Sequence, residues 1–234
     1  MAEKESKKES IEKDYKELGK GSFWLFIGLF FGRFLGIVFT ILMTRLFNVD
    51  EVGMFYLAFS VINFFTIFTG FELTGTLQTY SAYYYGKQKW DHLRKLIKAI
   101  FLVGLATSRV LFIAFLLFSN QISAYFNNMD LPDLIKVFAL YFIINSVFTL
   151  EQAFTVSFRL TKEASLAQLV QTVSKIVLIP VAIYFFGATS MSLTVLFIIS
   201  FALGLIPATY HFLKVYTALP APKKDESTYK EVAS

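Results

Sequence analysis

The sequence contains no cysteine, and among its 234 residues there are only two histidines and five prolines. The lack of cysteine excludes a disulfide framework and thiolate chemistry, and two histidines argue against a histidine-based metal site. The chain also has no phosphate-binding glycine loop, no HExxH zinc motif and no nucleophile elbow. The sequence therefore predicts no enzymatic activity, no cofactor, no metal and no site for ATP.

What the sequence does contain is apolar residues, which make up 56% of the chain and include 28 phenylalanines. This is more apolar surface than one ordinary soluble core can bury, so we expect a lipid bilayer to surround the fold. The net charge of +5 does not indicate a nucleic-acid partner, because the basic residues cluster beside the apolar segments. The N-terminus lacks the cleavage pattern of a signal peptide and is expected to stay attached.

Six segments reach the length of about 20 residues that a helix needs to cross a bilayer. The second can continue through Thr74–Tyr85, which is too long for one straight crossing, so we expect a break near Gly70 or Gly75. The sequence thus predicts an all-α membrane protein with a six-helix transmembrane bundle over residues 21–216. The predicted spans are Ser22–Leu46, Gly53–Phe71, Leu96–Phe118, Leu134–Val156, Leu166–Phe186 and Leu193–Leu213.

Alternate loops differ in charge, and this difference predicts the orientation of the bundle. Lys and Arg mark the cytoplasmic side of membrane proteins. The loops around Asn48–Glu51, Asn120–Asp133 and Ala188–Ser192 carry neither, with Lys136 as the nearest exception. We therefore expect a multi-pass protein of the cell membrane with both termini in the cytoplasm. The basic loops contain Lys87, Lys89, Arg94, Lys95, Arg159, Lys162, Lys214, Lys223 and Lys224.

The two ends of the chain lie outside the predicted bundle. In residues 1–20, Ile11, Tyr15 and Leu18 form one apolar stripe, which predicts a cytoplasmic interfacial helix; a disordered charged tail is the alternative. Residues 217–234 form a predicted cytoplasmic linker. The sequence YKEL at 15–18 is echoed by YKEV at 229–232, which would place the start of a second six-helix unit beyond this chain.

Single charges interrupt the predicted spans, and each costs about 2.5–3.5 kcal/mol in hydrocarbon even on the mild insertion scale. Arg33 lies roughly 16 Å into the first span. We expect it to face a wet cavity, with snorkelling to the interface as the alternative. Gly28, Gly32 and Gly36 beside it favour close helix packing. Arg109 is placed further toward the outside, and the three cations Arg33, Arg109 and Lys175 are predicted to face one shared cavity.

A polar stripe on the fifth span ends at Lys175. Gln168, Gln171 and Thr172 share its face, and such a stripe is expected to line a cavity. The alternative is a buried ion pair between Lys175 and Glu151. Glu72, near the expected break, would cap the following turn or lie at the membrane surface.

Several short motifs resemble the N-terminal half of the polysaccharide exporter and lipid-linked oligosaccharide flippase family, within the multidrug/oligosaccharidyl-lipid/polysaccharide exporter superfamily. They are GSFWL at 21–25, RLF at 45–47, GMFY at 53–56 and GFELT at 70–74, followed by a tyrosine-rich stretch before Gly86. The resemblance is clearest in the first three spans. The rest of the chain resembles the family by its architecture alone.

The resemblance implies one lobe of a two-lobe (6+6) exporter fold, which moves polyprenyl-phosphate-linked or polyprenyl-pyrophosphate-linked glycans across the membrane by alternating access. Its partners would be the lipid-linked glycan, membrane lipid, and a second lobe or a homodimer partner. A cation-coupled multidrug exporter and a non-transporting membrane scaffold are the alternatives. The candidate substrate-binding residues are Arg33, Lys175, Arg109, Gln168, Gln171 and Thr172, and Glu151 and Glu72 are candidates for an ion pair or for coupling.

Overall fold

The computed structural model describes residues 23, 26–28, 30–70 and 73–220. The predicted interfacial helix at 1–20, Glu72 and residues 221–234 of the predicted linker lie outside these described residues. Every described element is a helix, and six spans are long and apolar enough to cross a membrane when α2 and α3 are counted together. The helices are the N-terminal helix Phe26–Leu46, α2 Val49–Gly70, α3 Leu73–Gly86, α4 Trp90–Tyr125, α5 Leu131–Ser157, α6 Thr161–Phe186 and α7 Ser190–Ala218.

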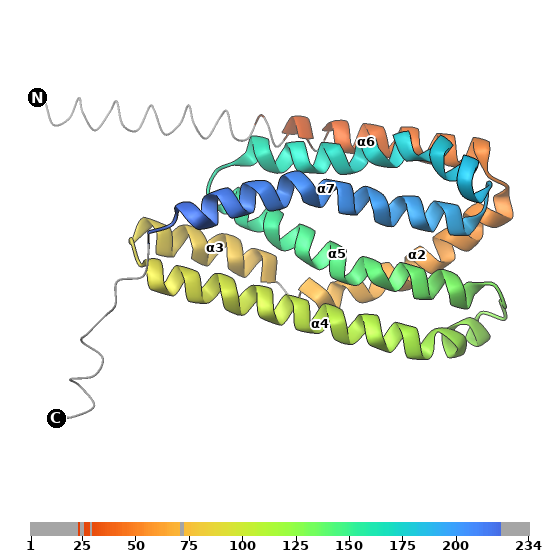
Figure 1. The fold of residues 1–234 in the computed structure, drawn as a ribbon, viewed down its shortest axis with the longest axis horizontal. Helices are drawn as coiled ribbons and strands as arrows, with labels where there is room; N and C mark the ends of the chain where they lie inside the picture. Colours follow the sequence, from red (N-terminus) through yellow and green to blue (C-terminus); the bar gives the residue numbers. More distant parts are fainter. Residues whose placement is uncertain (1–22, 24–25, 29, 71–72, 221–234) are drawn as a thin grey trace, which may run out of the picture.

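The helices run up and down along one long axis (Figure 1). Helix α5 is central, because it contacts α2, α3, α4, α6 and α7. With α7 it is the most deeply buried helix of the bundle, about half of its span being buried. Phe55, Phe138, Phe142 and Phe197 fill the larger of two apolar clusters. The predicted all-α six-span fold is confirmed.

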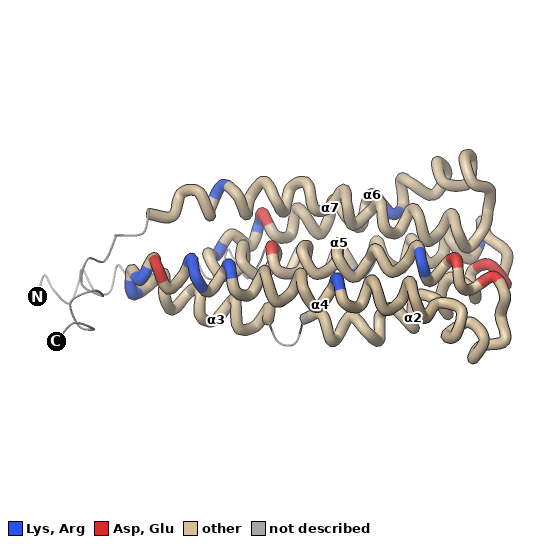
Figure 2. Tube along the Cα trace, turned by 60° about the horizontal axis from the view of Figure 1, so that its bottom comes forward, with Lys and Arg blue, Asp and Glu red and all other residues tan. Residues whose placement is uncertain are grey.

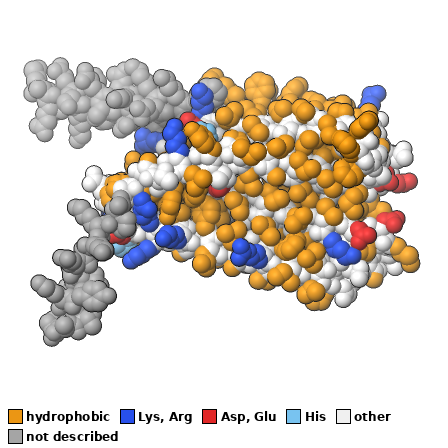
Figure 3. Space-filling view, viewed as in Figure 1, with side chains coloured by type: hydrophobic (Ala, Val, Ile, Leu, Met, Phe, Trp, Pro, Cys, Tyr) orange, Lys and Arg blue, Asp and Glu red, His pale blue; other side chains and the backbone are white. Residues whose placement is uncertain are grey.

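The outer surface of the bundle is strongly apolar. Hydrophobic side chains cover most of the face seen in Figure 3, and the basic side chains gather mostly toward one end. Exposed phenylalanines of the N-terminal helix and of α2, such as Phe30, Phe34 and Phe64, would be unfavourable in water. A lipid bilayer accommodates this apolar surface, because helices form their backbone hydrogen bonds internally and expose only side chains to lipid.

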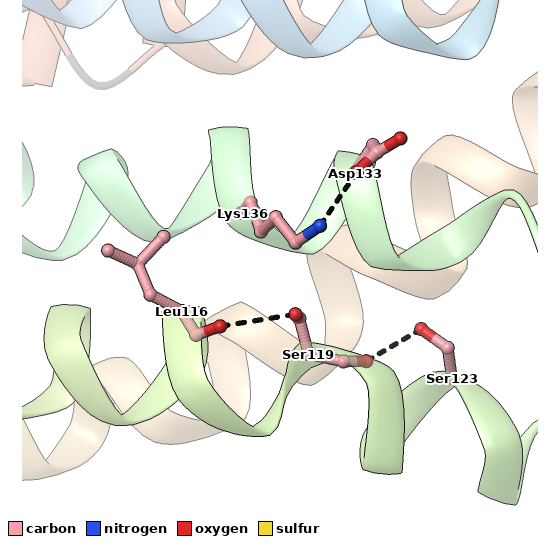
Figure 4. Close-up of polar contacts among 5 residues, drawn as sticks. All are labelled: Leu116, Ser119, Ser123, Asp133 and Lys136. Atoms are coloured by element: carbon pink, nitrogen blue, oxygen red, sulfur yellow. Dashed lines mark hydrogen bonds and ion pairs between the residues drawn. The ribbon is translucent and has the colours of Figure 1, made fainter.

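The two ends of the bundle differ in charge (Figure 2). We call the end that carries the α3–α4 and α5–α6 turns and the last residue of α7 the basic end, and the opposite one the acidic end. Lys136 at the acidic end is paired with Asp133 at 2.9 Å, while Ser119 and Ser123 of α4 donate to backbone oxygens of their own helix (Figure 4). The acidic end also holds Arg45, a basic residue that the loop comparison had not counted. Asp50, Glu51, Asp130 and Asp133 define the acidic end, and Lys87, Lys89, Arg94, Lys95, Arg159, Lys162 and Lys214 the basic end.

Small residues permit the closest helix contacts. A Cβ atom on Gly204 of α7 would lie 2.6 Å from Cβ of Gln171 in α6, and one on Gly28 would lie 2.6 Å from Oγ of Ser165. Gly32 and Gly36, in contrast, have open space where a Cβ would lie. The predicted packing stripe of the first helix is therefore limited to Gly28.

Helices α4 to α7 are longer than the spans predicted for them. Helix α4 begins six residues before and ends seven residues after the predicted Leu96–Phe118. Its 36 residues are about 54 Å long, so it extends beyond roughly 30 Å of hydrocarbon. Helix α2 ends at Gly70 and α3 begins at Leu73, and the two residues between them lie outside the described ranges, so the break expected near Gly70 or Gly75 stays a prediction.

Candidate functional site

Lys175 lies near the middle of α6 and points toward α7. Its Nζ atom is 4.5 Å from the centre of the Phe197 ring and 5.1 Å from that of Phe201. Aromatic faces attract a cation by about 0.5–2 kcal/mol. The structure shows no ion pair between Lys175 and Glu151, both of which are described. The amine is thus held by two rings of α7 rather than by a carboxylate.

The rest of the predicted polar stripe on α6 is divided between two environments. Gln171 is only 1% exposed, donates to Ser200 Oγ at 3.5 Å and lies against Gly204 of α7. Thr172 is also buried and donates to the backbone oxygen of Gln168 at 2.9 Å. These two residues pack between helices. Gln168 alone of the stripe lines one of the cavities described below.

Glu151 is buried in α5, with 4% of its surface exposed. The hydroxyl of Thr209 in α7 donates to both of its carboxylate oxygens, at 3.0 Å and 2.9 Å. The alternative prediction of an ion pair with Lys175 is not what the structure shows, since the partner of Glu151 is Thr209, 58 residues away. The contact joins the two central helices in the half of the bundle nearer the basic end.

Arg33 lies on the exposed face of the N-terminal helix. Thr40 and Thr44 follow on the same face, and their hydroxyls donate to the backbone of their own helix. A different face of the helix carries Phe39 and Met43, which are buried in the larger core cluster. The described bundle therefore leaves a face with a guanidinium and two threonines exposed.

Arg109 lies near the middle of α4 and is exposed. The predicted span Leu96–Phe118 and the observed helix have nearly the same midpoint, so the longer helix leaves Arg109 near the centre. Arg33, Arg109 and Lys175 are absent from the linings of the two cavities described below, and the shared cavity for the three cations stays a prediction.

A cavity of about 310 Å³ lies between α3, α5 and α6, with a mostly apolar surface into which a few polar side chains project. Sequence reasoning identified only Gln168 of its lining, because the remaining side chains come from helices far apart in the chain. The signal that could have found it is the recurrence of glutamine within apolar spans, at 78, 152 and 168. Its lining consists of Thr74, Gln78, Phe148, Thr149, Gln152, Ala153, Val156, Ala164, Ser165 and Gln168.

An apolar groove runs between α2 and α4. Its larger part, about 840 Å³, reaches from Leu111 to Phe126 of α4, and a second part of about 440 Å³ shares Phe65 and Leu111 with it. The side chains along it are mostly aromatic or aliphatic, with Gln121 near the acidic end. Within a bilayer, such a surface accommodates hydrocarbon chains. Among the described residues, no group of three or more His, Cys, Asp or Glu side chains could hold a metal ion.

The profile of one protein family, described as polysaccharide biosynthesis protein, matches residues 18–231. This match covers nearly the whole chain. The chain belongs to this family. Searches among curated proteins and among solved structures gave no significant match. The predicted family resemblance is confirmed, and the match includes all six membrane spans.

Family membership bears on the role of the polar groups inside the membrane spans. A polysaccharide biosynthesis protein built from six apolar spans is a membrane component of glycan assembly. Ionisable residues inside such spans are expensive and usually functional. Lys175, the exposed face around Arg33 and the cavity between α3, α5 and α6 are the polar features of the described bundle that this rule singles out.

Proposed function

We propose that this chain is one lobe of a transporter, not an enzyme, that moves a polyprenyl-phosphate- or polyprenyl-pyrophosphate-linked oligosaccharide across the cell membrane by alternating access. The observation that carries the proposal is family membership over residues 18–231. The lobe acts with a second lobe of six helices or with a second copy. Both termini lie in the cytoplasm, so the basic end faces the cytoplasm.

The cargo head is anionic, and the lobe supplies cations within its membrane-spanning part. Arg33 and Lys175 are the proposed phosphate ligands, with Arg109 as a further candidate. Charge-assisted hydrogen bonds in a poorly hydrated site are stronger than neutral ones. The aromatic contacts hold Lys175 without neutralising it, so its charge remains available to a phosphate.

The uncovered face of the N-terminal helix supports a second lobe on that side. Arg33, Thr40 and Thr44 are exposed on it, and Gly36 leaves room for a neighbouring group. A guanidinium turned to lipid would be costly, whereas one turned to a hydrated space between two lobes is solvated. Rocking of two lobes about such a space is how repeat transporters alternate access.

The proposal is tested in liposomes that contain the complete transporter, meaning this lobe together with its second lobe or second copy. A fluorescent lipid-linked oligosaccharide is incorporated into both leaflets of the liposomes. A membrane-impermeant quencher is then added, and the fraction of fluorescence that it removes is the fraction of lipid accessible in the outer leaflet. We expect the accessible fraction to change with time in transporter liposomes and to stay constant in protein-free ones. No change in liposomes that contain folded protein would overturn the proposal.

The same preparation separates the two alternatives. A cation-coupled multidrug exporter would move a cationic dye, and Arg33 on the uncovered face argues against that cargo because it repels cations. A membrane scaffold would move neither the dye nor the lipid-linked glycan. Transport of the glycan lipid without transport of the dye is the expected result.

A further inference from the structure

The cavity between α3, α5 and α6 is the one described cavity in which carboxamides from three helices converge within a membrane span. Gln78 comes from α3, Gln152 from α5 and Gln168 from α6. Counted from the helix ends at the basic end, all three lie roughly 8 to 12 Å deep. The three carboxamides bring hydrogen-bonding groups to a cavity whose surface is otherwise mostly apolar, so a bound polar group would find its partners in them.

The hydrogen-bonding groups in this cavity are of mixed type, as hydroxyl-rich ligands require. Each carboxamide has two donor hydrogens and an acceptor oxygen. Gln152 uses its nitrogen to donate to the backbone oxygen of Ala164 at 3.1 Å, which fixes α5 against α6. Gln78 is exposed, and Gln168 makes only a long contact of 3.4 Å with Gln171. Gln78 and Gln168 are thus the side chains best placed to bind a ligand.

The size and charge of the cavity restrict the ligand further. About 310 Å³ is at the lower end of the range of roughly 300–1,000 Å³ for small-molecule sites, so the cavity fits one small unit of a glycan. None of the described side chains that line it is charged. A uronic acid or a phosphate would find no cation there, whereas the hydroxyls of a neutral sugar would find donors and acceptors.

An aromatic group lies beyond the cavity toward the basic end. Tyr85 lies on the same face of α3 as Gln78, and its ring is 5.0 Å from that of Phe158 and 5.4 Å from that of Trp90. It is 48% exposed. Aromatic faces pack against the C–H faces of sugar rings, so this group extends a sugar-binding surface from the cavity to the membrane surface.

We infer that this cavity is a subsite for one uncharged sugar residue, in which Gln78 and Gln168 bind the sugar hydroxyls and select neutral glycans over acidic ones. This inference rests on the proposed function, which supplies the identity of the lipid that carries the glycan. It assigns the glycan and the phosphate to different residues, because Arg33 and Lys175 do not line the cavity.

The test uses the complete transporter in detergent and three probes: a polyprenyl diphosphate carrying a neutral oligosaccharide, the same lipid without sugar, and the free neutral oligosaccharide. The variants are Gln78→Met and Gln168→Met, which keep side-chain length and remove the hydrogen-bonding groups. Gln121→Met in the apolar groove is the matched control. Each cavity variant should weaken binding of the glycan lipid by about fivefold, as expected for one lost hydrogen bond. Binding of the sugar-free lipid should change less than twofold.

Each other outcome has a definite meaning. Equal weakening of both lipids, or a lower melting temperature with weaker binding throughout, would show that the glutamines are structural and would overturn the inference. Unchanged binding of the glycan lipid in both variants would also overturn it. If wild-type protein binds the free oligosaccharide in a Gln78-dependent way but moves no lipid, the proposed function fails and the sugar subsite stands. A probe with glucuronic acid should bind more weakly than its neutral counterpart, and equal affinity would contradict the selectivity.

Discussion

Replacement of Lys175 by Met should separate the charge of this residue from its packing. A lysine near the centre of a span costs about 2.5–3.5 kcal/mol. The cation–π contacts of the amine with the two rings offset only about 0.5–2 kcal/mol of this cost. Methionine keeps an unbranched apolar stem without the charge. The Lys175→Met variant should therefore have an unchanged or higher melting temperature.

Transport should respond in the opposite direction. If Lys175 binds the cargo phosphate, the variant loses a hydrogen bond to a charged group, worth about 1.5–3 kcal/mol. Since about 1.4 kcal/mol is a factor of ten in rate, translocation of the lipid-linked oligosaccharide should fall roughly 10- to 150-fold. The assay is the quencher-accessibility measurement in liposomes, with the melting temperature taken from the same protein preparation.

The control for this comparison is Lys136→Met. Lys136 is a lysine of the same bundle, but it is paired with Asp133 on the exposed acidic end. We expect near-normal translocation and stability, because exposed pairs contribute about 0–1 kcal/mol. Lys175→Met with normal translocation would refute the phosphate role. A lower melting temperature with a proportional loss of folded protein would show that Lys175 stabilises the α6–α7 contact instead.

Three further predictions follow from the packing and the topology. Gly204→Val should lower the melting temperature, because its side chain would displace Gln171 of α6, whereas Gly36→Val should be tolerated in open space. A double-mutant cycle of Glu151→Gln and Thr209→Val, measured by unfolding, should give a coupling energy of about 0.6–1.7 kcal/mol, and a value near zero would contradict the observed contact. A cysteine introduced at the exposed residue Asn127 should react only with reagent added outside the cell, and labelling from the cytoplasmic side alone would invert the proposed topology.

The membrane spans could be predicted from the sequence because their cause is local. A span must satisfy its own backbone hydrogen bonds and present apolar side chains for about 20 residues, and both properties can be read along the chain. The lengths were underestimated because helices such as α4 continue past the hydrocarbon into polar sequence. A break near Gly70 or Gly75 was predicted because the segment that α2 and α3 cover is too long for one straight crossing.

The arrangement of the polar side chains could not be predicted, because it depends on contacts between distant segments. Because Gln168 and Gln171 share a helix face, both were predicted to line a cavity. In the structure α7 covers Gln171, and only Gln168 lines a cavity. An ion pair with Lys175 was one alternative for Glu151, but a hydroxyl from α7 is its observed partner. The periodicity of one helix shows which residues share a face and not which neighbour covers it.

The central claim is that cations inside the membrane serve an anionic cargo, and the Arg33→Gln, Lys175→Gln double variant tests it most directly. Translocation of the fluorescent lipid-linked oligosaccharide is measured in liposomes with equal amounts of folded wild-type and variant transporter. We expect translocation to be almost abolished in the double variant. Arg33→Lys alone should retain part of it, because lysine keeps the charge and loses only the bidentate geometry. Full activity in the double variant would contradict the account and show that these charges are structural.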